Sequence, residues 1–156
     1  MSPGKGYPWV YLLMGVVAML MGGLLYIAGR GFSSPVYQMM PGSYYVEKTL
    51  LAIGIGAILH DNPVLTYSLP DGLWMFAIMC VQLWIWDKKI NNRTCAWKAI
   101  VYIICMSYEV LQISGVCPGT YDVNDVLFMS MGGTLPILIE LTIQNTKKWK
   151  DTRIQY

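Results

Sequence analysis

Residues 109–125 decide the fold of this chain, and they read EVLQISGVCPGTYDVND. One apolar run, residues 99–106, precedes this stretch, and another, residues 126–136, follows it. Between the runs lie a turn rich in glycine and proline and five acidic or amide side chains, Glu109, Gln112, Asp122, Asn124 and Asp125. A simple membrane anchor does not need three carboxylates within seventeen residues. The stretch therefore predicts two apolar helices joined by an acidic turn at one membrane face.

The composition is that of an integral membrane protein. Of the 156 residues, 55% are hydrophobic and 13% are charged, whereas about 25% of a typical soluble domain is charged. The mean hydropathy is +0.45, and several apolar runs are long enough for a helix to cross a bilayer. The net charge of +2 is too small to suggest a nucleic-acid partner.

The apolar runs predict an all-α fold: a polytopic membrane bundle of four spans plus one short interfacial or re-entrant helix. About twenty helical residues cross the roughly 30 Å of hydrocarbon. The spans are expected at residues 9–28, 69–86, 96–113 and 123–143, within a single membrane domain covering residues 1–156. The first apolar run exceeds the apolar part of a signal peptide, so it is expected to remain as a span.

The short helix is expected at about residues 47–60, around an apolar segment at 49–59. Eleven helical residues extend only about 16 Å, which suits a helix lying on or dipping into the outer leaflet. A helix in this position is compatible with covering the acidic cluster. His60, the only histidine, is interpreted as a surface residue at its end. If this segment did cross the bilayer, the chain would have five spans.

The basic residues predict the orientation. In the four-span arrangement, nine of the eleven Lys and Arg residues fall in the N-terminal segment, the loop at 87–98 or the C-terminal tail. Cytoplasmic loops of membrane proteins are enriched in Lys and Arg. We therefore expect this loop and the C-terminus in the cytoplasm and the acidic turn outside. The five-span arrangement places the acidic turn, the loop and the tail on the same sides.

Five side chains are candidate ligand-binding residues at the outer face: Asp71, Glu109, Gln112, Asp122 and Asp125. Glu109 lies within an apolar helix, roughly 6 Å below its outer end. Ionisable groups at such depth generally face the bundle interior. We therefore expect Glu109 to approach Asp125 and Asp71. Carboxylates and an amide suit an ammonium group, sugar hydroxyls or a divalent cation.

Some acidic residues also have simpler explanations. Asp71 follows Pro70 and is placed to cap the second span, and Asp122 or Asp125 is placed to cap the fourth. Glu140, near the cytoplasmic end of the fourth span, is expected to snorkel or to pair with a lysine of the tail.

The cysteines predict no metal site. Their spacing gives neither a C-x-x-C motif nor a zinc pattern, and the four are Cys80, Cys95, Cys105 and Cys117. Two of them lie inside apolar runs, where a thiol packs as a small hydrophobic group. We expect no disulfide, no structural metal and no cofactor.

Several motifs follow one another in a fixed order between residues 69 and 133: Leu69-Pro70-Asp71, Glu109-x-x-Gln112, Pro118-Gly119, Asp125 and Gly132. This ordered set resembles the VanZ-like family of small polytopic bacterial membrane proteins, named after a teicoplanin-resistance protein. Three positions depart from that pattern, because Met75, Thr120 and Met129 stand where the family tends to have His, Arg and Asn. The resemblance implies a bacterial inner membrane and a link to antibiotic resistance, and it implies no particular reaction.

Three functions are compatible with these residues. The first is a binding or resistance-type protein whose outward acidic pocket engages an envelope lipid head group, a cell-wall precursor or a cationic compound. The second is an intramembrane enzyme acting on a lipid-linked substrate, with paired carboxylates as acid and base. The third is a structural subunit whose polar cluster pairs with a partner helix. Membrane lipids surround the protein in each case, and a homo-oligomer or a partner membrane protein is compatible with all three.

Overall fold

The computed structural model describes residues 7–30, 38–39, 41–54, 61–117 and 120–154, with side chains up to residue 150. Within these residues the fold is all-helical and contains no strand, which confirms the predicted all-α class. Its five helices are α1 (Trp9–Arg30), α3 (Ser43–Ala52), α5 (Pro63–Ile85), α6 (Asn92–Ile113) and α7 (Val123–Ile154).

Four of these helices are long and apolar enough to cross a membrane: α1, α5, α6 and the part of α7 up to Lys150. The fifth, α3, has ten residues and extends only about 15 Å. In the described parts of the chain the four-span arrangement therefore holds. The predicted short helix exists, but it begins at Ser43, before the expected start. His60 and the rest of residues 55–60 lie outside the described residues.

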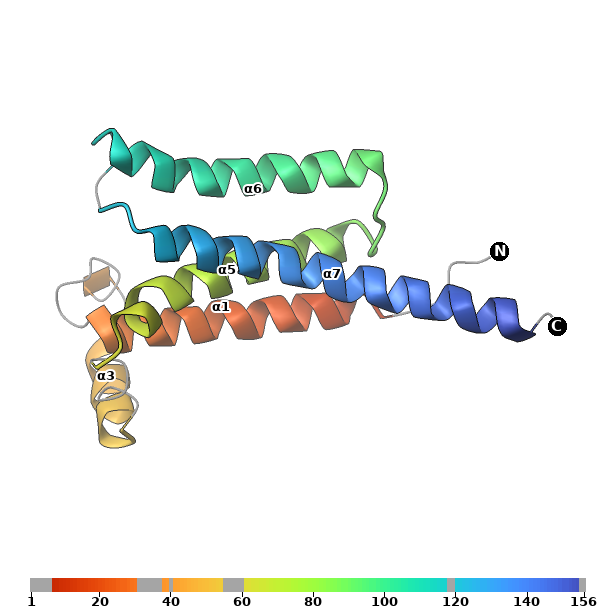
Figure 1. Ribbon diagram of the computed structural model, residues 1–156. Helices are drawn as coiled ribbons and strands as arrows, with labels where there is room; N and C mark the ends of the chain where they lie inside the picture. The colour runs from red at the N-terminus through yellow and green to blue at the C-terminus, as the bar shows by residue number, and fades with distance from the viewer. Residues whose placement is uncertain (1–6, 31–37, 40, 55–60, 118–119, 155–156) are drawn as a thin grey trace.

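Helices α1, α5 and α7 form the packed body of the bundle, and α6 lies beside them with far fewer contacts (Figure 1). The start of α1, the end of α7 and the α5–α6 connection lie at one end of the bundle. At the other end lie the last turn of α1, helix α3 and the connection from α6 to α7. The acidic turn and the basic loop therefore lie at opposite ends of the helix bundle.

Helix α5 starts six residues before its predicted beginning. Asn62 caps it, with its side-chain oxygen accepting from the backbone N–H of Leu65 at 3.4 Å, and Pro63 occupies the first turn. An Asn cap followed by proline is a strong helix start, because proline has no N–H to leave unpaired there. Asp71 is consequently the ninth residue of α5. Its interpretation as an N-cap is wrong, and Pro70 lies inside the helix.

Two further boundaries differ from the expected ones. Helix α6 begins at Asn92, because Asn91 and Thr94 form a reciprocal capping box one turn before the apolar run. Helix α7 runs to Ile154, well past the predicted end at 143. Its last turns carry Lys147, Lys148 and Lys150, whose helix propensity is high and does not depend on a bilayer.

Glycine brings the backbones of α5 and α7 into direct contact. A Cβ atom added at Gly132 would overlap the carbonyl of Gly72, and one added at Gly72 would lie 2.9 Å from the carbonyl oxygen of Phe128. Small residues at a helix interface permit this close approach in membranes. Because Asp71 adjoins Gly72 and Asp125 lies two turns before Gly132, this contact fixes how the two aspartates face each other.

A buried polar contact joins α1 to α7 near the opposite end of the bundle. Glu140 is only 4% exposed. It accepts hydrogen bonds from the Tyr11 hydroxyl at 2.7 Å and from the Gln144 amide at 2.8 Å. The expectation that Glu140 snorkels to the interface is therefore wrong. Its carboxylate stabilises the bundle through donors from two helices.

Tyr11→Phe is expected to lower the free energy of unfolding by about 1–2 kcal/mol, because a buried carboxylate loses one of its donors. The measurement is denaturant or thermal unfolding in detergent micelles. Tyr7→Phe is the matched control, since Tyr7 is 69% exposed. Equal stability of the two variants would show that the Tyr11 hydroxyl contributes nothing to the packing of α1 on α7.

Candidate acidic binding site

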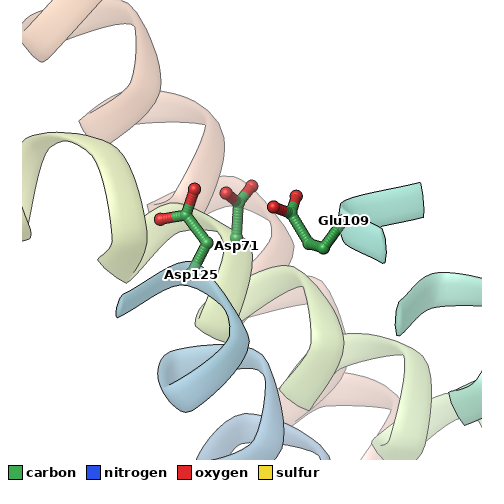
Figure 2. Close-up of side chains that lie close together, drawn as sticks. All are labelled: Asp71, Glu109 and Asp125. Atoms are coloured by element: carbon green, nitrogen blue, oxygen red, sulfur yellow. The ribbon is translucent and has the colours of Figure 1, made fainter. Parts of the chain in front are cut away.

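Three carboxylates from three helices converge at the end of the bundle where α6 meets α7. Asp71 comes from α5, Glu109 from α6 and Asp125 from α7. One oxygen of each lies within 4.8 Å of the others, and Figure 2 shows the three side chains directed toward one another. Glu109 is 6% exposed, Asp125 is 8% exposed and Asp71 is half-buried. The expected approach of Glu109 to Asp125 and Asp71 is present in the structure.

The three carboxylates line a cavity of about 740 Å³ between α6 and the packed body of the bundle. Gln112, Thr120 and Asp122 line its polar part, and all belong to the end of α6 or to the segment entering α7. Met75 and Ile78 of α5 line a deeper, apolar part. Ile78 is seven residues beyond Asp71, about 10 Å further along the helix. The cavity is therefore acidic at one end and apolar toward the middle of the span.

Arg30, at the end of α1, also lines this cavity. Its guanidinium donates to the Tyr26 hydroxyl at 3.2 Å and lies over the Tyr26 and Tyr67 rings at 4.4 and 5.3 Å. Arg30 is one of the two basic residues that the predicted topology leaves at the outer face, and the sequence pattern does not join it to the acidic cluster. The available signal was its position as the last residue of a span that ends at that face.

The two remaining candidates line the cavity in supporting positions. With its amide nitrogen facing the acceptors, Gln112 donates to the Thr120 carbonyl at 3.1 Å and to Glu109 Oε2 at 3.3 Å. Asp122 precedes the first residue of α7, and its Oδ1 accepts from the backbone N–H of Asn124 at 2.8 Å. Asp122 therefore caps α7, as one of the alternatives held. Gln112 holds Glu109 in place.

Asp125 is in the first turn of α7, yet its side chain does not cap the helix. Its Oδ1 is buried and has no hydrogen-bond partner within the described residues. Buried polar oxygens are nearly always hydrogen-bonded, because an unpaired one loses its interaction with water and gains nothing. Asp125 lines the acidic end of the cavity, and one of its oxygens is thus a buried acceptor without a partner among the described residues.

The arrangement is electrostatically costly when it is empty. Charges about 5 Å apart interact by roughly 3 kcal/mol per pair at an effective dielectric of 20. Repulsion among close carboxylates is relieved by a bound proton or by a cation. No short sequence motif indicates such a site, because its three acidic groups come from helices that are far apart in the sequence. Among the described residues the cluster is the one candidate cation site, and it consists of carboxylates that the sequence analysis matched to an ammonium group, sugar hydroxyls or a divalent cation.

Helix α3 does not cover the site. It packs beside α1 and extends away from α6, on the far side of the packed body (Figure 1). None of its described residues lines the acidic cavity. The suggestion that the short helix roofs the cluster is therefore wrong for residues 43–52.

Comparison of the chain with protein-family models, curated proteins and solved structures finds no match. The resemblance to the VanZ-like family therefore stays a prediction from the ordered sequence motifs between residues 69 and 133.

Proposed function

We propose that this chain is a VanZ-like integral membrane protein whose acidic pocket faces outward and binds a polar or cationic ligand. The ligand is an envelope lipid head group, a lipid-linked cell-wall precursor or a cationic compound. One observation carries the proposal: Asp71, Glu109 and Asp125 converge at the polar end of a cavity, and one Asp125 oxygen has no hydrogen-bond partner among the described residues. A purely structural polar contact satisfies its buried groups, as Glu140 is satisfied by Tyr11 and Gln144.

The shape of the cavity supports an amphiphilic ligand. Carboxylates and Gln112 line one end, and Met75, Ile78 and Cys105 line the other part. Hydroxyl or ammonium groups match the first region, and an alkyl chain matches the second. Helix α6 packs lightly against α5 and α7. We therefore propose that the alkyl chain of a lipid enters the cavity beside α6.

An intramembrane enzyme acting on a lipid-linked substrate is the alternative, and the closeness of the carboxylates favours it. Two acidic groups whose environments differ can divide the roles of acid and base. Glu109 is buried whereas Asp71 is half-buried. A chemically altered lipid that accumulates with the wild-type protein, and not with Glu109→Gln, would favour this alternative over simple binding.

The binding proposal is tested by what the protein retains from its own membrane. Wild type, Asp71→Asn and Asp87→Asn are extracted into polymer-bounded nanodiscs, and bound lipids and small molecules are identified by native mass spectrometry. Asp87 lies in the connection at the opposite end, and its φ of 48° is tolerated by asparagine. We expect a molecule enriched with wild type and Asp87→Asn to be lost with Asp71→Asn. The same set of molecules in all three samples would reject the proposal.

The outward orientation of the pocket is tested by cysteine labelling in intact cells. Cys95 is exposed at the start of α6, and Cys117 lies partly exposed beyond its other end. In single-cysteine variants, a membrane-impermeant maleimide is expected to label Cys117 and to leave Cys95 unreacted until the cells are permeabilised. Labelling of Cys95 alone would place the acidic pocket in the cytoplasm.

A further inference from the structure

We infer that Asp71, Glu109 and Asp125 bind one hard divalent cation of about the size of Ca²⁺. This inference rests on the proposed function, because it names what the same pocket holds. It follows from three properties of the cluster: the spacing of the oxygens, the acceptor left without a partner and the balance of charge.

The spacing of the oxygens matches a coordinated cation. Three points no more than 4.8 Å apart leave some position within about 2.8 Å of all three, since 4.8 Å divided by √3 is 2.8 Å. Ca²⁺ binds oxygen at about 2.3–2.6 Å, and Mg²⁺ at about 2.1 Å. Movements of a few tenths of an ångström therefore suffice for Ca²⁺. Three rotatable carboxylates on separate helices provide that freedom (Figure 2).

The Asp125 oxygen is an independent indication of a ligand. Asp125 is more than nine-tenths buried, and its Oδ1 has no hydrogen-bond partner among the described residues. Its carboxylate lies beside that of Asp71, with Glu109 on the other side of Asp71 (Figure 2). Asp71 and Glu109, the two other carboxylates of the cluster, are acceptors, so Asp125 forms no hydrogen bond with either while all three are ionised. A cation satisfies all three carboxylates at once.

The charge balance favours a divalent cation over an ammonium group. The three carboxylates carry −3 when ionised, and Arg30 at the rim of the cavity contributes +1. A divalent ion brings this set to zero, whereas an ammonium leaves one negative charge more. Asp122 also lines the cavity, and its carboxylate is half-exposed and tied to Asn124. Its charge is therefore more strongly screened by solvent.

Three carboxylates leave coordination positions open on a cation that takes six to eight oxygens. Those positions face the cavity, whose apolar part continues toward Met75 and Ile78. A phosphate or hydroxyl oxygen of a head group is a suitable further ligand. The cation thereby gives an acidic pocket the means to bind an anionic head group.

The test uses the full chain in nanodiscs after treatment with EDTA, with Ca²⁺ and the luminescent ion Tb³⁺ as probes. Trp74 lines the cavity and can transfer excitation to bound Tb³⁺. We expect saturable Tb³⁺ luminescence that Ca²⁺ displaces, and an affinity at least about tenfold weaker in Asp125→Asn, since affinity follows ligand charge. Glu109→Gln repeats the test from another helix should Asp125→Asn fail to insert. Asp87→Asn is expected to bind like wild type.

The outcomes separate this inference from the proposed function. The cation site is overturned if wild type binds neither ion at millimolar concentration. It is also overturned if Asp125→Asn and Glu109→Gln both bind the two ions with the affinity of wild type. If the same samples still retain a membrane-derived molecule through Asp71, the proposed function survives alone. If the cation binds and no such molecule is found, the cation site stands and the wider function fails. Displacement of Tb³⁺ by ethylammonium, and not by Ca²⁺, would identify the pocket as an ammonium site instead.

Discussion

Gly132→Ala is expected to separate α5 from α7 and to destabilise the bundle by about 3 kcal/mol. The added methyl group would overlap the backbone carbonyl of Gly72, and a backbone atom cannot turn aside as a flexible side chain can. Overpacking of a well-packed interface typically costs about 1–3 kcal/mol, and more when the backbone itself must move. Unfolding in detergent by denaturant or heat measures the loss.

Gly23→Ala is the matched control, because a Cβ there would meet nothing within 4 Å. Alanine favours helix over glycine, so this variant is expected to be as stable as wild type or slightly more stable. Gly132→Ala should also lose affinity for Tb³⁺, since a shift of α7 separates Asp125 from Asp71. A Gly132→Ala protein with the stability of Gly23→Ala would show that α5 and α7 do not pack through these glycines.

The four spans could be predicted because the length and hydropathy of an apolar run are sufficient to identify a membrane-spanning helix. The predicted start of α5 is wrong although Asn62-Pro63 is a strong start signal, because Pro70-Asp71-Gly72 also resembles a helix start and lies nearer the most apolar residues. A proline inside a membrane helix is tolerated when neighbouring groups compensate the lost hydrogen bond. Both sites combine a capping side chain with an adjacent proline, but only at Asn62-Pro63 does the proline follow the cap, which is the order that favours a helix start.

The convergence of Glu109 with the aspartates was predictable from the cost of turning a carboxylate toward lipid. The role of Arg30 was not, because chain position gives the depth of a residue but not the rotation of its helix toward a neighbour. For the same reason, the sequence does not show that an oxygen of Asp125 is buried without a hydrogen-bond partner. At the level of sequence, Asp122 and Asp125 were equivalent capping candidates. Only packing through Gly72 and Gly132 turns one of them into the pocket.

Glu109→Gln is expected to abolish retention of the membrane-derived ligand and, in EDTA, to raise the stability of the empty protein by about 1 kcal/mol. The reason is the repulsion among three carboxylates within 4.8 Å. That repulsion amounts to roughly 3 kcal/mol per ionised pair at an effective dielectric of 20, and a bound proton already relieves part of it. Glutamine keeps the length of the side chain and an oxygen able to accept from Gln112.

A substitution that raises stability but lowers ligand binding indicates a binding site, because such sites contain groups that destabilise the protein without its ligand. Unfolding in EDTA and in Ca²⁺ measures both effects: Ca²⁺ should stabilise wild type more than it stabilises Glu109→Gln. Asp122→Asn should alter binding far less, because asparagine caps α7 equally well and the carboxylate lies outside the cluster. A Glu109→Gln protein that is less stable than wild type and still retains the ligand would make Glu109 a structural residue and would favour a helix-pairing role for the cluster.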